Sequence, residues 1–270
     1  MNYLSREGAP VSALLWEKID AAVINAARSA LTGRRFIHLF GPLGSGVTNI
    51  NIDDAELQEV VADGLQVTKG RKYVEIPTLF EDFTLLARDL ESSERTGYPL
   101  DLSAAAAAAQ ACARKEDRLL FFGSEALGYE GLLTAKGVNT LKKKDWAEGE
   151  NAFADVSAAV ETLVSKGIYG SYALALSPDL YMQLQRIQPG TGLLESERIG
   201  KLLDGRIFQA PALGKGRAVV VSADARNVDL VVGQDLATAY LEQKDLNHSF
   251  RVVESVLPRI KRRQAIVVFE

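Results

Sequence analysis

Apolar residues between positions 12 and 32 recur every three or four residues, which is the spacing of one face of a helix. Ser12 precedes the first of them and suits a helix start, and Gly33 follows the last and suits a helix end. The second half of this apolar stripe consists largely of alanine, so another surface could approach it closely. We predict an amphipathic helix that packs on the protein's own core or on a partner.

The next region alternates between apolar and polar residues, as strands do. Residues 35–40 are strand-like, residues 41–46 form a glycine-rich turn, and the alternation then runs through residues 48–68. Residues 73–76 are a further strand candidate. We predict a long hairpin that projects from the body. Because a two-stranded hairpin is marginal in water, it would need a neighbouring surface.

Helical patterns return in the middle of the chain, first at residues 80–95 and then at residues 102–120. The second helix carries six consecutive alanines, residues 104–109, which place alanine on every face. We therefore predict a central helix packed closely on all sides. Beyond it we expect helices at 153–166, 178–184 and 195–203, a strand at 172–176, and a polar turn at 185–192.

The end of the chain has the composition of strands throughout. We expect strands at 217–221, 229–232, 238–242, 250–257 and 260–269. Helices in the middle followed by strands at the end predict an α+β fold and not alternating βαβ units.

Composition narrows the function classes. The chain has 270 residues, 47% of them apolar and 24% charged, which predicts a folded protein with a sizeable core. Its formal net charge of −4 is unfavourable for a dedicated nucleic-acid binder. No apolar run is long enough to span a membrane, and the first residues lack a signal-peptide core, so we expect a cytoplasmic protein.

Reactive side chains are scarce. Cys112 is the single cysteine, so an intrachain disulfide and a cysteine-based zinc site are excluded. His38 and His248 are the two histidines, which leaves little for acid–base chemistry. We expect no metal site, no cofactor and no enzymatic activity, although a soluble enzyme that uses His248 with a nearby carboxylate remains an alternative.

Three tempting motifs have simpler interpretations. Residues 41–48 nearly match a phosphate-binding loop, but Val47 occupies the position of the lysine that reaches the outer phosphates. Asp245 and His248 have the spacing of a carboxylate–histidine pair, yet we expect His248 to be a hydrogen-bonded structural residue. The basic cluster at residues 259–263 suits a charged strand edge, and nucleic-acid contact is the less favoured alternative.

A series of short motifs in order along the chain resembles the encapsulins, the shell proteins of bacterial and archaeal nanocompartments. The motifs are Ala9-Pro10, Trp16-Glu-Lys-Ile-Asp20, Gly33-Arg-Arg-Phe36, Gly41-Pro-Leu-Gly44, Asp82-Phe-Thr-Leu-Leu86, Arg88-Asp-Leu90, Pro99-Leu-Asp-Leu-Ser103, Glu116-Asp117, Phe121-Phe-Gly123, Gly128-Tyr-Glu-Gly-Leu132, Ser177-Pro-Asp-Leu-Tyr181, Asn247-His248, Phe250-Arg251-Val252 and Arg259-Ile260. No single motif is diagnostic, but their order and spacing together are specific.

The resemblance implies the Hong Kong 97 phage-like major capsid fold and a division of the chain into parts. Residues 1–40 would form an amino-terminal helix and arm, and residues 47–77 an extended loop that lies across a neighbouring subunit. Residues 78–125 and 223–270 would form the peripheral domain, and residues 126–222 the axial domain.

The resemblance also implies two functional sites. A peptide on the cargo enzyme would dock in a groove between the amino-terminal helix and the peripheral sheet. By position this groove would contain Ala26, Ala27, Ala30, Leu31, Leu230, Val232, Leu236 and Tyr240. A pore at the five-fold axis would be lined by the loop Gln185, Arg186, Ile187, Gln188, Pro189, Gly190, Thr191, Gly192, Leu193 and Leu194.

The partners that the resemblance implies are further copies of the chain, sixty or a larger multiple of sixty, and a cargo enzyme with a terminal targeting peptide. Three variant motifs favour the iron-storing branch and hence a ferritin-like cargo: Gly41-Pro-Leu-Gly44, Gly128-Tyr-Glu-Gly131 and Asn247-His248. A dye-decolourising peroxidase cargo and a prophage-type major capsid protein are the alternatives. Arg88 stands where some relatives bind a flavin with tryptophan, so no flavin is expected.

Overall fold

The computed structural model describes residues 3–270, apart from the side chains of residues 53–57. Met1 and Asn2, which the predicted amino-terminal arm includes, lie outside the described residues. The chain forms two compact units. The first contains residues 1–31, 40–116 and 231–257, and the second contains residues 32–39, 117–230 and 258–270. These two units do not test the predicted division into peripheral and axial domains, which stays a prediction.

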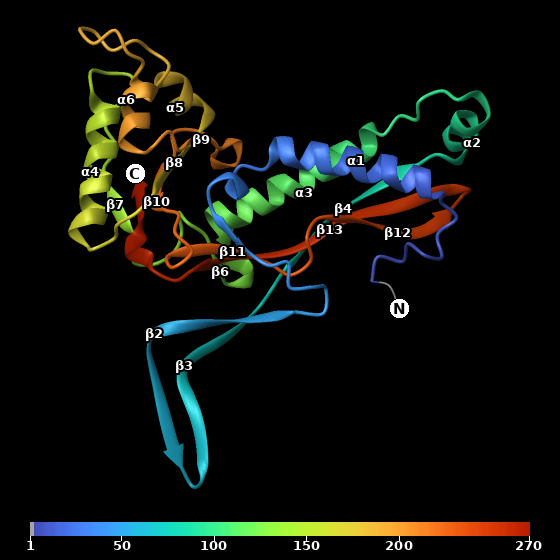
Figure 1. Ribbon diagram of the computed structural model, residues 1–270, viewed down its shortest axis with the longest axis horizontal. Helices are drawn as coiled ribbons and strands as arrows, with labels where there is room; N and C mark the ends of the chain where they lie inside the picture. Colours follow the sequence, from blue (N-terminus) through green and yellow to red (C-terminus); the bar gives the residue numbers. More distant parts are fainter. Residues whose placement is uncertain (1–2) are drawn as a thin grey trace. The chain divides into compact units, whose positions relative to one another are not determined.

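The first unit confirms the amino-terminal helix. Helix α1 spans Ala13–Ala30, and the Ser12 hydroxyl accepts a hydrogen bond from the Leu15 N–H at 3.2 Å. Its apolar stripe buries Trp16, Ile19 and Val23 in a cluster with residues of helix α3 (Ser103–Phe122) and the sheet. Figure 1 shows α1 and α3 lying over the strands of this unit.

The strands beneath these helices belong to a five-stranded sheet with the order β1-β11-β13-β12, in which β4 also pairs with β13. The strands are β1 (His38–Phe40), β4 (Thr78–Leu85), β11 (Val228–Val232), β12 (Ala237–Lys244) and β13 (Asn247–Ile260). Strands β4 and β12 are both antiparallel to β13, with Phe250 opposite Phe83 on one side and Tyr240 on the other. The predicted α+β layout is confirmed.

The predicted helix at 80–95 is wrong in its first half, because β4 occupies residues up to Leu85 and the helix α2 spans Ala87–Thr96. Phe83 and Leu85 are buried, whereas Asp82 and Thr84 are exposed, so this segment follows the two-residue period of a strand. Pairing with β13 satisfies its backbone, and the Phe83 ring stacks on Phe250 at 5.2 Å between centroids.

The sequence predicted that the alanine-rich helix α3 packs closely on every face, and this prediction is wrong. Ala105, Ala108 and Ala109 are buried against α1 and the sheet, but Ala104 and Ala107 are exposed. Alanine on all faces would permit close packing on all sides, but helix α1 and the sheet cover only the face that carries Ala105, Ala108 and Ala109.

The predicted long hairpin is present as strands β2 (Asn49–Ala62) and β3 (Leu65–Glu75), which project from the sheet of their unit in Figure 1. The predicted strand bounds are wrong, because the turn divides the segment expected at residues 48–68 and the second strand begins at Leu65 instead of residue 73. Asp63 and Gly64 at the tip both have positive φ, 51° and 76°, which fits the tight hairpin turn that matches strand twist. Val61, Leu65 and Val67 near the tip are 69%, 71% and 56% exposed, so these apolar side chains are largely uncovered within the protomer.

The second unit is built on a five-stranded sheet with the order β7-β14-β10-β8-β9. The strands are β7 (Asn139–Leu141), β8 (Tyr172–Leu176), β9 (Ile207–Gln209), β10 (Ala218–Ser222) and β14 (Ile266–Phe269). Helices α4 (Asn151–Ser165), α5 (Pro178–Gln183) and α6 (Glu195–Leu202) contribute to its core with the fully buried Trp146. A two-stranded pair, β5 (Gly123–Ser124) and β6 (Tyr129–Glu130), completes the unit.

The prediction of one continuous strand at 260–269 is wrong. Strand β13 ends at Ile260, a short 3-10 helix spans Arg263–Ala265, and β14 begins at Ile266. The backbone N–H groups of Lys261 and Arg262 both donate to the Asn227 carbonyl, at 2.8 and 3.0 Å. These bonds redirect the chain between two apolar segments that the sequence pattern alone presents as continuous.

Candidate functional site

The groove predicted between the amino-terminal helix and the sheet is partly assembled by the first unit. One apolar cluster brings together six of its eight residues. They are Ala26, Ala27, Ala30, Leu31, Leu236 and Tyr240. Leu230 is fully buried and belongs to the second unit, and Val232 is 2% exposed, so neither side chain offers an accessible surface.

Within this cluster the side chains differ in access. Ala27 and Leu31 are buried, whereas Ala26, Ala30, Leu236 and Tyr240 are half-buried. These four residues, from α1 and β12, form a half-buried apolar strip, which we call the α1–β12 strip. Its role in binding a peptide remains a prediction.

The segment Leu4–Arg6, which precedes helix α1, contacts the Tyr240 end of this strip and the first half of the helix. The Tyr240 N–H donates a hydrogen bond to the Leu4 carbonyl at 3.0 Å, on the edge strand of the sheet. Arg6 forms an ion pair with Asp20 at 2.6 Å, and its guanidinium lies 4.0 Å from the centre of the Trp16 ring. Sequence reasoning missed these contacts because residues before the helix have no periodic pattern.

His248 lies at the same end of the strip and has the structural role predicted for it. It is 8% exposed, and its Nδ1 lies 3.2 Å from the Tyr240 hydroxyl. Burial and the Glu242 carboxylate raise the pKa of Tyr240, so this hydroxyl keeps its proton near neutral pH.

The predicted pore loop is a small hairpin in the second unit. Ile187 and Leu194 form an isolated antiparallel bridge, and the Gln188 N–H donates to the Leu193 carbonyl at 2.9 Å. Gly190 and Gly192 have φ values of 81° and 67°, which other residues rarely adopt. The tip, residues 189–192, is exposed and carries no charged side chain.

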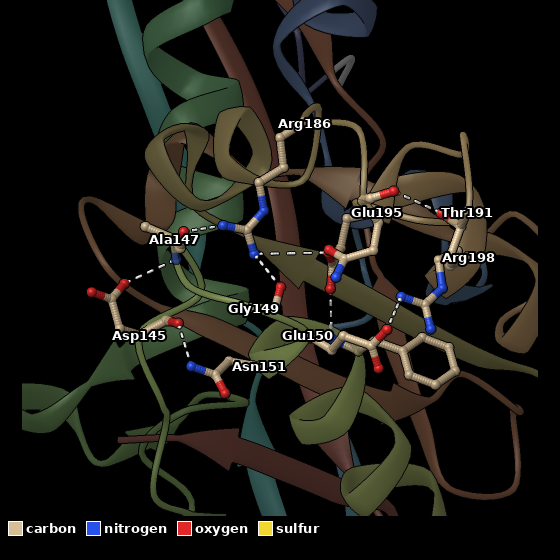
Figure 2. A network of polar contacts seen from close by, with 11 residues as sticks. Asp145, Ala147, Gly149, Glu150, Asn151, Arg186, Thr191, Glu195 and Arg198 are labelled. Atoms are coloured by element: carbon tan, nitrogen blue, oxygen red, sulfur yellow. Dashed lines mark hydrogen bonds and ion pairs between the residues drawn. The ribbon is translucent and has the colours of Figure 1, made fainter.

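The base of this loop is held by the polar network in Figure 2. Arg186 donates to the carbonyls of Ala147 and Gly149, and its Nη2 lies 3.8 Å from Glu195 Oε2. Arg198 pairs with Glu150 at 3.0 Å nearby. The sequence indicated a polar turn, but it gave no sign that the loop is tied to residues 147–149.

The other candidate motifs have structural roles. The N–H groups of Leu43 and Gly44 donate to the carbonyls of Val232 and Gly233, at 2.9 and 2.8 Å, so they are not free to cradle a phosphate. In the basic cluster, Arg259 and Lys261 bind the buried Asp229 at 2.7 and 2.6 Å. These charges stabilise the fold, which weakens the nucleic-acid alternative.

Residues able to hold a metal ion do not gather anywhere in the described part of the chain, in groups of three or more His, Cys, Asp or Glu. Cys112 is fully buried, as predicted for an inert residue. Burial and the adjacent Glu254 carboxylate raise the pKa of its thiol, so it stays protonated near neutral pH. No helix within residues 3–270 is both long and apolar enough to cross a bilayer.

Comparison with known proteins assigns nearly the whole chain to one family. A family model described as "Encapsulating protein for peroxidase" matches residues 1–257. A curated relative, the type 1 encapsulin shell protein EncA of Myxococcus xanthus, is 39% identical over 277 residues. That alignment covers 100% of this chain and 96% of the relative.

Solved structures show the same fold. A virus-like particle from Pyrococcus furiosus matches with a TM-score of 0.77 at 23% identity, covering 94% of this chain and 99% of that one. The capsid of the Myoviridae phage XM1 matches with a TM-score of 0.64 at 15% identity, covering 87% and 90%. The predicted Hong Kong 97 phage-like capsid fold is confirmed.

Proposed function

Because the chain belongs to the encapsulin family of self-assembling shell proteins, we propose that its shell encloses a ferritin-like cargo enzyme bound through a docking peptide. The observation that carries the docking role is the α1–β12 strip. A half-buried apolar surface on a folded unit has surface left to bury. A peptide that placed a few apolar side chains there would gain about 1.5–3 kcal/mol for each one fully buried.

Cargo identity rests on relatives that carry a further domain. A relative from Pyrococcus furiosus, 26% identical over 77% of this chain and 56% of its own length, is named a ferritin-like-encapsulin shell fusion protein. A relative from Kuenenia stuttgartiensis, 38% identical over 94% of this chain and 72% of its own length, is named a diheme-cytochrome-encapsulin shell fusion protein. The first supports a ferritin-like cargo, and the second marks an electron-transfer cargo as a further outcome of the test.

Ferrous iron would be the substrate of the enclosed enzyme and would enter through pores. We assign the loop at residues 185–194 to the rim of the five-fold pore. Its exposed tip lacks charged side chains, so it would oppose neither cations nor anions strongly. We propose that the oxidation chemistry belongs to the cargo, an assignment that the scarcity of cysteine and histidine in the shell protein supports.

A peroxidase is the second candidate cargo, because the matching family model is described as encapsulating a peroxidase. Co-expression of this chain with one candidate cargo at a time, followed by purification of intact shells, distinguishes the two. Retention of the peroxidase and exclusion of the ferritin-like protein would contradict our assignment.

Docking is tested separately by charge on the α1–β12 strip. We expect Ala30→Asp and Leu236→Asp to abolish cargo retention in shells of normal size, because a carboxylate there would have to lose water on peptide binding. The matched control is Asn25→Asp, an exposed position on the same helix. Normal loading of both strip variants would rule out the docking assignment.

A further inference from the structure

Arg186 and Glu195 flank the loop at residues 185–194 and are joined by their backbones. The Glu195 N–H donates to the Arg186 carbonyl at 3.1 Å, one step below the bridge between Ile187 and Leu194. The two side chains at the base of this hairpin also meet, as Figure 2 shows. Both ends of the loop are therefore held at one place.

The Glu195 carboxylate is fully buried and has three partners from two segments, the start of α4 and the loop itself. Its Oε1 accepts from the N–H of Phe153 in the first turn of α4 at 3.2 Å, and Arg186 lies near Oε2. With its amide oriented to satisfy both groups, Gln188 donates to Glu195 Oε2 at 2.9 Å and to the Gly149 carbonyl at 3.1 Å. A buried carboxylate is strongly unfavourable without such partners, so it holds them in place.

Arg186 connects the loop to a different segment. Its guanidinium donates to the carbonyls of Ala147 and Gly149, the second at 2.8 Å, and these residues precede α4. The planar guanidinium can serve both carbonyls and the carboxylate at once, which a lysine cannot do. The loop is thus fixed against the body of its unit by its first residues.

The hydrogen bonds of Thr191 at the tip stay within the loop and do not reach the body of the unit. Thr191 donates from its hydroxyl to the Gln188 carbonyl at 3.0 Å, a bond within the loop. Residues 189–192 are exposed. The direction in which the tip points is therefore decided at the base, where a small rotation produces a larger displacement of the tip.

We propose that Arg186 and Glu195 are positioning residues for the pore: together they set how far the loop tips extend over the opening and hence how fast small cations cross the shell. This inference rests on the proposed assignment of the loop to a pore. It adds that pore width depends on the pair formed by Arg186 and the buried Glu195, and not on the residues of the tip alone.

The experiment follows Co²⁺ entry into intact shells reassembled around calcein-labelled dextran, with fluorescence quenching as the readout in a stopped-flow instrument. We expect Arg186→Ala to change the quenching rate several-fold and Arg186→Lys to give an intermediate rate. Amide hydrogen exchange should rise at residues 187–194 in the same order. The matched control is Arg198→Ala, which removes an arginine whose ion-pair partner is Glu150 and not a loop residue.

Thr191→Trp in the otherwise unchanged chain separates the two levels of the argument. If Thr191→Trp alters entry but Arg186→Ala and Glu195→Gln shells quench at the parental rate, the positioning role is wrong and the pore assignment stands. If Thr191→Trp also leaves entry unchanged, the loop does not line the route and the pore assignment itself fails. Should Arg186→Ala not assemble, the Arg186→Lys rate and exchange pattern decide the question.

Discussion

Two glycines show how single residues control the route of the chain after α3. Gly123 and Gly131 lie where β5 and β6 pair, with Gly123 opposite Glu130. A Cβ on Gly123 would lie 2.1 Å from the Tyr129 carbonyl oxygen and 2.8 Å from the Gly131 nitrogen, both backbone atoms. The motifs containing these residues are visible in the sequence, but the steric demand is not, because it depends on two segments brought face to face.

We expect Gly123→Ala to destabilise the second unit far more than Gly128→Ala. Both positions have positive φ, 64° and 75°, so each alanine carries left-handed strain of about 1–2 kcal/mol. Only Gly123 adds a clash with backbone, because the space around Gly128 is open. Urea unfolding followed by fluorescence of the buried Trp146 measures the difference, and equal midpoints for the two variants would contradict it.

At the scale of elements, the errors in prediction share one physical cause. The pattern at residues 80–85 suits either a helix or a strand, and pairing with β13, far away in sequence, decides for the strand. The break between β13 and β14 likewise depends on bonds to Asn227. Helix α1 and the presence of the β2–β3 hairpin were predictable because the helix cap and the periodicity of both elements are local, but the position of the hairpin turn was not.

The β4–β13 pairing provides a pH test. Asp82 lies directly opposite Arg251, and the guanidinium donates to both carboxylate oxygens at 2.6 and 2.8 Å. The hydrogen bond from Arg251 lowers the pKa of Asp82 below its usual 3.8. A carboxyl whose pKa is lower in the folded state contributes stability above its unfolded pKa, and this contribution is lost as pH falls through the folded pKa.

We therefore expect Asp82→Asn to lower the free energy of unfolding at pH 7 by a few tenths to about 1 kcal/mol, the range for an exposed pair. The difference from the parental protein should shrink as the pH falls below about 4 and vanish once Asp82 is protonated in both states. Urea midpoints at pH 7 and pH 3, followed through Trp16 in the first unit, provide the check. A constant difference across this range would show that the ion pair is not its source.

At the scale of the whole molecule, we expect the exposed apolar surface described for the hairpin tip to be buried in the shell. The hairpin presents exposed apolar side chains on a thin two-stranded support, which is unfavourable for an isolated monomer. A self-assembling shell protein can bury such a surface against further copies. The α1–β12 strip and the loop assigned to the pore were located through resemblance. The bond from Tyr240 to Leu4 and the contact between Arg186 and Glu195 join segments far apart in the fold or at the two ends of a loop, so no local pattern encodes them.

Assembly should therefore depend on one face of the hairpin tip. Leu65 and Val67 lie two positions apart on the same strand and point to the same side, so Leu65→Glu combined with Val67→Glu places charge on that side. We expect folded protomers or small oligomers and no closed shells, measured by size-exclusion chromatography and negative-stain imaging. Gln66→Glu, on the opposite side of the same strand, is the matched control and should assemble normally. Closed shells of parental diameter from the double variant would mean that the tip is not buried at a subunit interface.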